Sequence, residues 1–448
     1  MAKKPPTELQ PWQTAPQATL TPLVSDPSQQ QAVLILARQG TGHPVAIGQI
    51  GHAITARAIQ VMLDYNASAC AVRYMIDGQW EPGPELTREL GDAMLLTLKQ
   101  LCQLNPADRR SAQNGKCQAK LGKDKFTMTL KSQGTAQGER VLIRMDPEKI
   151  PFQRLEDLGM RDTMIEQFRE ALNSENSCVL VGSPRGAGLT ATWIVTLNAA
   201  DRLIRDFQSV ELEDEPELEV INVNPNFYGG STGLTASQLL HKMILKEPDV
   251  FVLPSIPDEA SWVTTLAQAA EKEKQVIARY PANTAIEACA RIVAQYPKGA
   301  KHFAATVKAV LNQRLVRRLC EDCKQGFQPT PQLLQKLGIP AGRVTTLYQQ
   351  FVMPPIEQQV DAKGKPAPIP PCAKCQARGY FGRLGIFELF KPGPKFRAAL
   401  LKTTDLAELN KISQAEGHRG LQSEAILAVA RGLTTLDEIK RAFAKPSA

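Results

Sequence analysis

The sequence predicts an α/β protein built on a largely parallel sheet, and two observations carry this prediction. From Cys178 onward, short apolar strands alternate with helices at a spacing typical of a parallel sheet flanked by helices. The segment CVLVGSPRGAGLTATWIVTLNAADRL (178–203) reads as an apolar strand, a loop of small residues and a helix. That order is the setting of a phosphate-binding loop, or P-loop.

Length, charge and cysteine content restrict the class of protein. A chain of 448 residues is long enough for two or three domains with sizeable cores. The net charge of +8 is dispersed, so it does not indicate a nucleic-acid partner or a membrane surface. No apolar run reaches the roughly 18 residues of a membrane span. The N-terminal sequence MAKKPPTELQPW lacks the apolar core of a signal peptide. We therefore expect a cytoplasmic protein.

The N-terminal third predicts a tail and a small domain. Residues 1–27 are rich in Pro, Gln and Thr and show no helical or strand period, so we expect a disordered tail. Residues 28–148 show an α+β pattern and should form one small domain. Its expected elements are the apolar run VLIL (33–36), helices over 54–65 and 86–104, and strands at 69–78, 116–121, 125–131 and 140–145.

Residues 149–448 should form the larger domain, which begins after a short Pro-bounded linker (146–151). Strands and helices alternate through its first half, and helices close the chain over 391–448. The expected strands lie at 178–182, 209–214, 218–223, 249–255 and 275–280, and the expected helices at 161–174, 234–247, 262–272, 285–296 and 308–319.

The phosphate-loop motif G-x-x-x-x-G-K-[ST] is incomplete here. Glycines let backbone N–H groups face phosphates, the lysine reaches the outer phosphates, and the hydroxyl binds Mg²⁺. In this chain Leu189 occupies the lysine position and cannot supply that charge. The backbone cradle and the hydroxyl remain as candidates for binding ATP and Mg²⁺; they comprise Pro184, Arg185, Gly186, Ala187, Gly188 and Thr190.

Four of the nine cysteines form two C-x-x-C pairs, namely Cys320 with Cys323 and Cys372 with Cys375. Each C-x-x-C turn offers two thiolates, and four thiolates are the ligand set of a structural zinc ion. We therefore expect a zinc-binding subdomain over residues 320–390.

Two charged clusters remain open to more than one interpretation. Arg314, Arg317 and Arg318 lie within about one turn of the helix expected at 308–319, where they either contact phosphate or a neighbouring subunit, or form a solvated basic face. The acidic residues either hold a cation or lie on an exposed loop; they are Glu211, Glu213, Asp214, Glu215 and Glu217.

Together these residues resemble the hexameric traffic ATPases of type II secretion and type IV pilus assembly. The most specific segments are NQRLVRRLCEDC (312–323), CAKCQARGYFGRLGIFELF (372–390) and RGLTTLDEI (431–439). The resemblance covers roughly residues 50–440 and implies a RecA-like domain preceded by the family's PAS-like second N-terminal domain, which VRYMIDG, LNPADRRSAQNGK and GERVLIRM match in order. From the resemblance we expect no counterpart of the larger N-terminal domain that many members use to dock at the membrane, and only the short tail in its place.

The departures from the family pattern concentrate at catalytic positions. Leu189 stands where the family has its phosphate-loop lysine, Ser255 where it has the Walker B glutamate, and Pro281 where it has the histidine of its histidine box. In the aspartate-box region Glu213 and Asp214 remain, so Glu213 is a possible remnant of the catalytic set. Losing one charge-stabilising group commonly lowers a rate by about 10²- to 10³-fold, so three losses predict little catalysis.

Three functions follow as hypotheses. The first is a degenerate ATPase that serves as a structural or regulatory subunit in a homomeric or mixed ring, with an intact relative or the inner-membrane platform of a secretion or pilus machine as partner. The second is a divergent active ATPase in which Arg185 replaces the lysine. The third is a nucleotide-binding switch that does not hydrolyse. The family also implies a cytoplasmic location that reaches the membrane only through partners.

Overall fold

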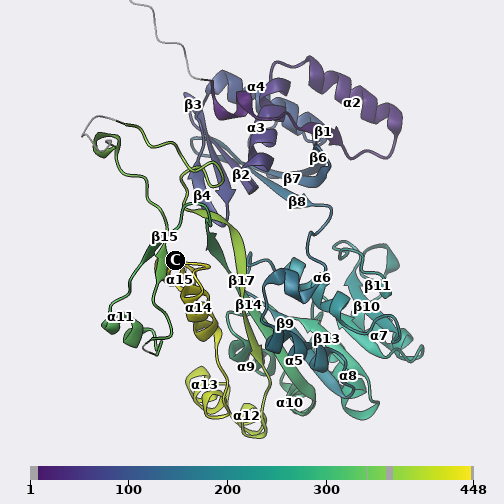
Figure 1. Ribbon diagram of the computed structural model, residues 1–448. Coiled ribbons are helices and arrows are strands. Elements are labelled where there is room, and N and C mark those ends of the chain that lie inside the picture. Colours follow the sequence, from purple (N-terminus) through teal and green to yellow (C-terminus); the bar gives the residue numbers. More distant parts are fainter. Residues whose placement is uncertain (1–8, 341, 360–366, 445–448) are drawn as a thin grey trace, which may run out of the picture. The chain divides into compact units, whose positions relative to one another are not determined.

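The computed structural model describes residues 9–340, 342–359 and 367–444. The chain divides into two compact units, Met1–Pro151 and Phe152–Ala448 (Figure 1). Each unit has a hydrophobic core of its own.

The first unit is an antiparallel sheet with helices packed against it. The strands follow the order β1-β6-β7-β8-β2-β3-β4, and β5 pairs with β3. The elements are α1 (Pro11–Thr14), β1 (Thr19–Pro22), α2 (Pro27–Gln39), α3 (His43–Thr55), β2 (Ala58–Tyr65), β3 (Ala69–Ile76), β4 (Gln79–Pro82), β5 (Leu86–Thr87), α4 (Arg88–Leu101), β6 (Gln113–Leu121), β7 (Asp124–Thr135) and β8 (Gly138–Pro147).

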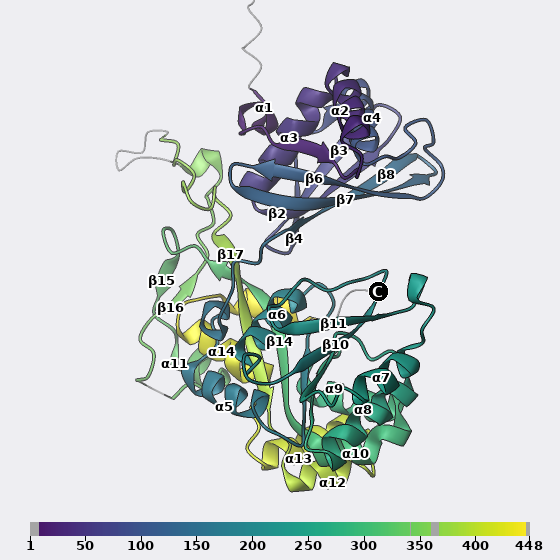
Figure 2. The ribbon, with the colours of Figure 1, turned by 90° about the vertical axis from the view of Figure 1, so that its right-hand side faces the viewer.

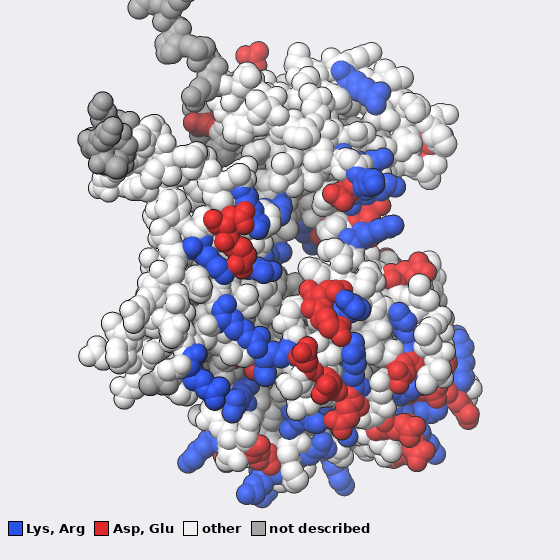
Figure 3. All heavy atoms as spheres, viewed as in Figure 1, with Lys and Arg blue, Asp and Glu red and all other residues white. Residues whose placement is uncertain are grey.

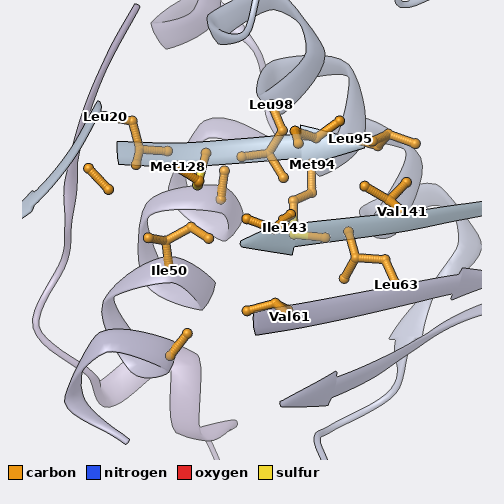
Figure 4. Close-up of a cluster of buried hydrophobic side chains, with 14 of the residues drawn as sticks. Leu20, Ile50, Val61, Leu63, Met94, Leu95, Leu98, Met128, Val141 and Ile143 are labelled. Atoms are coloured by element: carbon orange, nitrogen blue, oxygen red, sulfur yellow. The ribbon is translucent and has the colours of Figure 1, made fainter. Parts of the chain in front are cut away.

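The core of this unit lies between the sheet and helices α3 and α4 (Figure 4). Burial alternates along β2, β3 and β8, so one side of each strand faces the helices. Helix α4 contributes Met94, Leu95 and Leu98, which meet Val141 and Ile143 of β8.

The expectation of a disordered tail over residues 1–27 is wrong for the described part of that segment. Thr19–Pro22 form the edge strand β1, which pairs with β6 in the register Thr19↔Lys120. Ala18 and Leu20 are buried. A Pro- and Gln-rich segment is ordered here because a partner strand a hundred residues away supplies its hydrogen bonds, and composition does not reveal such a partner. Residues 1–8 lie outside the described residues.

One further element of the first unit differs from expectation, and the structure assigns the apolar run that the sequence left untyped. The helix expected over 54–65 is instead the end of α3 followed by strand β2, which pairs with β3 and β8. The apolar run VLIL lies within helix α2, which Asp26 caps by accepting a hydrogen bond from the backbone of Ser28.

The second unit is built on a sheet of order β11-β10-β12-β13-β9-β14-β17 (Figure 2). All neighbouring strands in it are parallel except β14 and β17. This confirms the predicted parallel sheet. The strands are β9 (Ser177–Gly182), β10 (Phe207–Leu212), β11 (Val223–Tyr228), β12 (Val250–Leu253), β13 (Gln275–Arg279), β14 (Val307–Leu319) and β17 (Tyr380–Phe390).

Helices connect these strands, and further helices follow the last strand. Helix α5 (Asp162–Leu172) precedes the first strand. The connecting helices are α6 (Leu189–Ala199), α7 (Ala236–Ile244), α8 (Glu259–Glu271), α9 (Ala285–Gln295) and α10 (Ala300–Thr306), and the closing helices are α12 (Pro394–Leu400), α13 (Leu406–Ala415), α14 (Leu421–Ala430) and α15 (Leu436–Phe443). Single 3₁₀ turns lie at Leu155–Leu158, Gly230–Thr232, Pro297–Gly299 and Ile356–Gln358. In the described ranges, no helix has both the length and the apolar character needed to cross a bilayer.

The arginine-rich helix expected at 308–319 is wrong, because this segment forms strand β14. Leu, Arg and Gln favour helices when they are considered residue by residue. Here β14 pairs with β9 on one side and with β17 on the other, and the burial gained between two strands overrides that local preference. The strand expected at 218–223 is also displaced, since β11 begins only at Val223.

A small lobe projects between β14 and β17. It contains β15 (Gln325–Phe327), α11 (Pro331–Lys336) and β16 (Leu347–Gln349), with β15 antiparallel to β16. The lobe begins and ends at the two C-x-x-C pairs, one of which follows β14 and the other of which precedes β17.

Candidate functional site

The carboxyl ends of four neighbouring parallel strands form the candidate site. Strands β9, β10, β12 and β13 end at Gly182, Leu212, Leu253 and Arg279, at one edge of the sheet. In open α/β sheets, ligands bind in the crevice outside this edge. The segments after these strands carry the sequence-predicted phosphate loop, the acidic cluster, Ser255 and Pro281.

The phosphate loop connects β9 to α6 as the sequence predicts. Gly186 and Gly188 have φ angles of 76° and 80°, a left-handed conformation that favours glycine. At Gly188 an added Cβ would also lie 2.9 Å from Cδ1 of Leu315 on β14. Glycine therefore serves two needs at the N-cap of helix α6, where backbone N–H groups can face an anion.

Gln313 of β14 fastens this loop, a role that the sequence did not indicate. Its side chain is buried; Nε2 donates to the carbonyl oxygen of Ala187 at 2.8 Å, and Oε1 accepts from the hydroxyl of Thr192. One amide thus connects the loop, the first turns of α6 and strand β14. The sequence signal for this role is a single polar residue in a segment whose composition predicts a helix.

Within the described part of the chain, the side chains at the cation and hydroxyl positions make no hydrogen bond or ion pair. Leu189 is partly buried at the first position of α6, and Thr190 is exposed. Arg185 is also exposed, and its side chain makes no hydrogen bond or ion pair with the described residues. The loop has the backbone form of a phosphate cradle, but the side chain that follows Gly188 is aliphatic.

The segments containing Ser255 and Pro281 are used for structural contacts. Ser255 is exposed, and Asp258 caps α8 through hydrogen bonds from the backbone N–H and the hydroxyl of Ser261, at 2.7 and 3.0 Å. The carbonyl of Pro281 accepts from Arg291, and Asn283 donates to Glu287 from both its backbone and its side chain. No carboxylate follows β12 at the position of Ser255.

The acidic residues at the end of β10 and in the segment after it do not converge on one point. Glu211 accepts from the hydroxyl of Ser209 and the backbone N–H of Glu217. Glu213 accepts from Ser231 and Thr232, and these hydrogen bonds hold the pKa of its carboxyl below its usual range. Within the described ranges, carboxylates do not assemble into a group able to hold a metal ion, so the interpretation of this cluster as a cation site is not supported.

Arg279 also places a cation at this edge of the sheet, and no sequence motif pointed to it. It ends β13, and its guanidinium binds both carboxylate oxygens of Glu217, with Nη1 at 3.1 Å from Oε2. Its Nε donates to the carbonyl of Pro254 at 2.7 Å. The available signal was one arginine closing an otherwise apolar strand, QVIARY.

The arginines of β14 are used mainly within the chain. Arg317 pairs with Glu438 at 2.7 Å and lies over the ring of Tyr380 at 4.0 Å. Arg314 donates to the carbonyl of Ala442 and lies over Phe443. Of the three, Arg318 is the most exposed, and it lies 3.6 Å from Glu321. On the face shown in Figure 3, acidic and basic side chains are intermingled over the second unit.

The four predicted cysteines come together at the root of the lobe. Cys320 follows the end of β14, Cys375 precedes β17, and the backbone N–H of Cys320 donates to the carbonyl of Gly379. Their four sulfur atoms lie within 4.8 Å of one another, with Cys320 3.8 Å from Cys372 and Cys323 3.5 Å from Cys375. A tetrahedral ion with Zn–S bonds of about 2.3 Å requires sulfur separations of about 3.8 Å.

The local environment favours thiolate at one of these sulfurs. Backbone N–H groups of Cys375 and Lys374 donate to Cys372 and lower the pKa of its thiol to about 7. Burial raises the pKa of Cys320, so without a metal ion the four sulfurs are not equivalent. The four cysteines can hold one tetrahedral ion. Each of the other five cysteines, at 70, 102, 117, 178 and 289, is buried.

Comparison with curated proteins identifies relatives in protein transport. The chain is 27% identical over 373 residues to the type IV pilus assembly ATPase PilB of Thermus thermophilus, covering 82% of this chain and 39% of that protein. It is 25% identical over 394 residues to type II secretion system protein E of Pseudomonas aeruginosa, covering 88% and 73%. The match thus spans well under half the length of the Thermus relative.

Comparison with solved structures shows the same fold. The Legionella pneumophila ATPase DotB aligns with a TM-score of 0.56 at 11% identity, over 88% of this chain and 94% of that one. The pilus retraction motor PilT with bound ADP aligns with a TM-score of 0.50 at 17% identity, over 89% and 96%. The family model described as type II/IV secretion system protein matches residues 44–441. The chain therefore belongs to the family of type II/IV secretion system proteins.

Proposed function

We propose that this protein is a ring-forming subunit of a type II secretion or type IV pilus machine that does not hydrolyse ATP at a rate useful to a motor. Its role is then structural or regulatory, in a homomeric ring or beside an intact ATPase. The family match supports a place in a secretion or pilus machine. The residues at the carboxyl ends of the strands support the loss of ATP turnover.

This proposal rests on how the charged side chains are paired at the carboxyl ends of the parallel strands. Phosphoryl transfer needs cations on the outer phosphates and a carboxylate that orders Mg²⁺ or water. Leu189 and Ser255 provide neither group. Glu211, Glu213 and Asp258 all accept hydrogen bonds from neighbouring donors, and Glu217 is paired with Arg279. A catalytic set would require several of these contacts to rearrange at once.

The four-cysteine site is proposed to hold zinc with a structural role. All four ligand positions come from the protein, which is typical of a closed structural site and not of a catalytic one. The site joins the ends of β14 and β17, so a bound ion would fix the lobe to the central sheet. We propose that the protein works in the cytoplasm and reaches the inner membrane only through its partners.

Arg185 keeps the divergent-ATPase alternative open to experiment. It is the basic residue of the loop, and its side chain makes no hydrogen bond or ion pair with the described residues that would hold it away from a ligand. It does not replace the missing carboxylate, however, and phosphoryl transfer needs that group as well.

Steady-state phosphate release by the assembled, zinc-loaded protein tests the proposal. We expect release no faster than that of a sample without protein. Robust release that Arg185→Ala abolishes would establish the divergent ATPase instead. Calorimetric titration with ATP in parallel separates an empty crevice from a nucleotide switch that binds without turnover.

A further inference from the structure

We propose that Arg279 is the cation that meets the phosphate chain of a nucleotide in this crevice, and that such binding does not require a divalent metal ion. This inference rests on the proposed function, because it concerns the same crevice. It assigns a positioning and specificity role to a residue that contributes to none of the sequence motifs.

Arg279 lies beside both elements that flank the phosphate loop, strand β9 and helix α6. In the parallel pairing of β13 with β9 it is in register with Val181, and Gly182 then ends β9 before the loop. Its guanidinium carbon lies 5.6 Å from the ring centre of Trp193, on the helix that the loop begins. Strand β13 therefore places a guanidinium between the two elements that the phosphate loop joins.

The contacts of Arg279 leave donors for a ligand. A guanidinium has five N–H groups. Three hydrogen bonds hold it in the described structure, one to the carbonyl of Pro254 and two to the carboxylate of Glu217. Two N–H groups thus lack a partner, and about four-fifths of the side chain is buried, since 21% remains exposed. The Glu217 side chain is 19% exposed, so both members of the ion pair retain some access to solvent.

This arrangement replaces the electrostatic role of a metal ion. Mg²⁺ commonly neutralises nucleotide phosphates while carboxylate and carbonyl oxygens hold it. Here a carboxylate and a carbonyl hold a guanidinium instead, and a guanidinium recognises phosphate through paired hydrogen bonds. Glu217 balances this charge when no ligand is present, and a phosphate would compete with Glu217 for Arg279.

Arg185 is the alternative cation, and the structure distinguishes the two residues. The Arg185 side chain is exposed and makes no hydrogen bond or ion pair with described residues, so ordering it on a ligand costs conformational entropy. Arg279 is held by its hydrogen bond to the carbonyl of Pro254 and by its position over the ring of Trp193, whether or not a phosphate displaces Glu217. Preorganisation favours Arg279 as the phosphate contact.

Calorimetric titration of the full-length, zinc-loaded protein with ATP tests this inference, once with Mg²⁺ and once with a chelator of divalent ions that spares the zinc site. We expect equal affinity in the two conditions. Arg279→Gln should weaken binding by roughly 10- to 100-fold, as for loss of hydrogen bonds to a charged group. Glu217→Gln should strengthen binding because it removes the competing charge. Arg185→Gln tests the competing cation and should weaken binding less than Arg279→Gln does. Arg169→Gln, on α5 where Arg169 pairs with Glu156, is the matched control and should leave affinity unchanged.

Folding of each variant is checked by circular dichroism and thermal unfolding. If Arg279→Gln does not fold, Arg279→Lys and Glu217→Gln decide the question, since lysine keeps the charge and should retain part of the metal-independent binding. Binding that appears only with Mg²⁺ would overturn the inference. So would loss of binding in Arg185→Gln but not in the Arg279 variants.

Failure of this inference is distinct from failure of the proposed function. If neither the wild type nor Glu217→Gln binds ATP, the role of Arg279 is refuted, whereas an absence of turnover still agrees with the proposed function. Phosphate release measured on the same samples decides the latter. Rapid release would refute the proposed function whatever the calorimetry shows.

Discussion

The carboxylate of Glu438 on helix α15 accepts hydrogen bonds from both the backbone N–H and the Nε atom of Arg317 on strand β14, each at 2.8 Å. Arg441 donates to the same carboxylate from Nε and Nη2, and the Glu438 side chain has no solvent exposure. This cluster fastens the C-terminal helix to the central sheet. Arg317 is therefore a poor candidate for a contact with a neighbouring subunit.

Glu438→Gln should lower the free energy of unfolding by about 3 kcal/mol at neutral pH, because it leaves two partly buried guanidinium groups without a countercharge. Burial raises the pKa of this carboxyl, but hydrogen bonds from Arg441 and Arg317 outweigh burial, and the net pKa is lowered. The stabilisation is complete above the unfolded-state pKa of about 4.3 and disappears as the pH falls through the lower folded-state pKa.

Urea unfolding of both proteins across this pH range provides the measurement. The difference between wild type and Glu438→Gln should shrink as the pH falls below about 4. Asp437→Asn is the matched control: it changes the neighbouring, exposed carboxylate and should alter stability by less than about 0.5 kcal/mol. A difference independent of pH would contradict the assigned role of the Glu438 charge.

The purified protein should contain about one zinc ion per chain, because a four-thiolate site is closed and binds the ion with all four positions. Elemental analysis of protein prepared without chelators gives this number directly. Cys320→Ser should reduce the zinc content and increase proteolysis within residues 320–390. Cys102→Ala, outside the four-cysteine site, should retain the zinc. Protein that is free of zinc before any chelator is added would refute the assignment.

Gln313→Leu should loosen the phosphate loop without unfolding the second unit. The change removes the hydrogen bonds to Ala187 and Thr192 and leaves their buried polar atoms unpaired, at a cost of roughly 1–3 kcal/mol. Hydrogen exchange should quicken over residues 183–192. Gln414→Leu, an exposed glutamine on α13, should leave exchange there unchanged. Equal exchange in Gln313→Leu and wild type would show that the loop does not depend on this amide.

Lys99→Met should destabilise the first unit by about 3–5 kcal/mol, because it leaves Glu139 as a buried charge without its closest partner. The two side chains are 1% and 2% exposed and lie 2.6 Å apart. The double variant Lys99→Met with Glu139→Leu should recover much of the loss, since it removes both charges together. Chemical unfolding of the two single variants and the double variant gives the coupling. Purely additive losses would argue against a buried ion pair.

The parts of the fold that the sequence predicted are those encoded locally. Strand β9, the loop of glycines and helix α6 follow one another along the chain, and their composition predicts them. The four cysteines were predictable because C-x-x-C spacing has few structural uses other than metal binding. The alternation of strands and helices likewise predicted the parallel sheet of the second unit.

The parts that sequence reasoning missed depend on partners far along the chain. Strand β14 contains good helix formers, but pairing with β9 and β17 decides its conformation. Strand β1 is ordered by β6. Arg279 and Glu217 are separated by 62 residues and meet only because β10 and β13 end at the same edge. A single sequence does not reveal such long-range contacts. The position of Arg279 beside Glu217 could therefore not be predicted.

We propose that this protein does not turn over ATP because the phosphate-loop lysine and the Walker B glutamate are both absent. Steady-state phosphate release by wild type, Leu189→Lys and the double variant Leu189→Lys with Ser255→Glu tests it most directly, on zinc-loaded and assembled samples. We expect no release from wild type, nucleotide binding at most from the single variant, and measurable release only when the carboxylate is also restored. Robust release by the wild type that Leu189→Lys does not increase would contradict the claim.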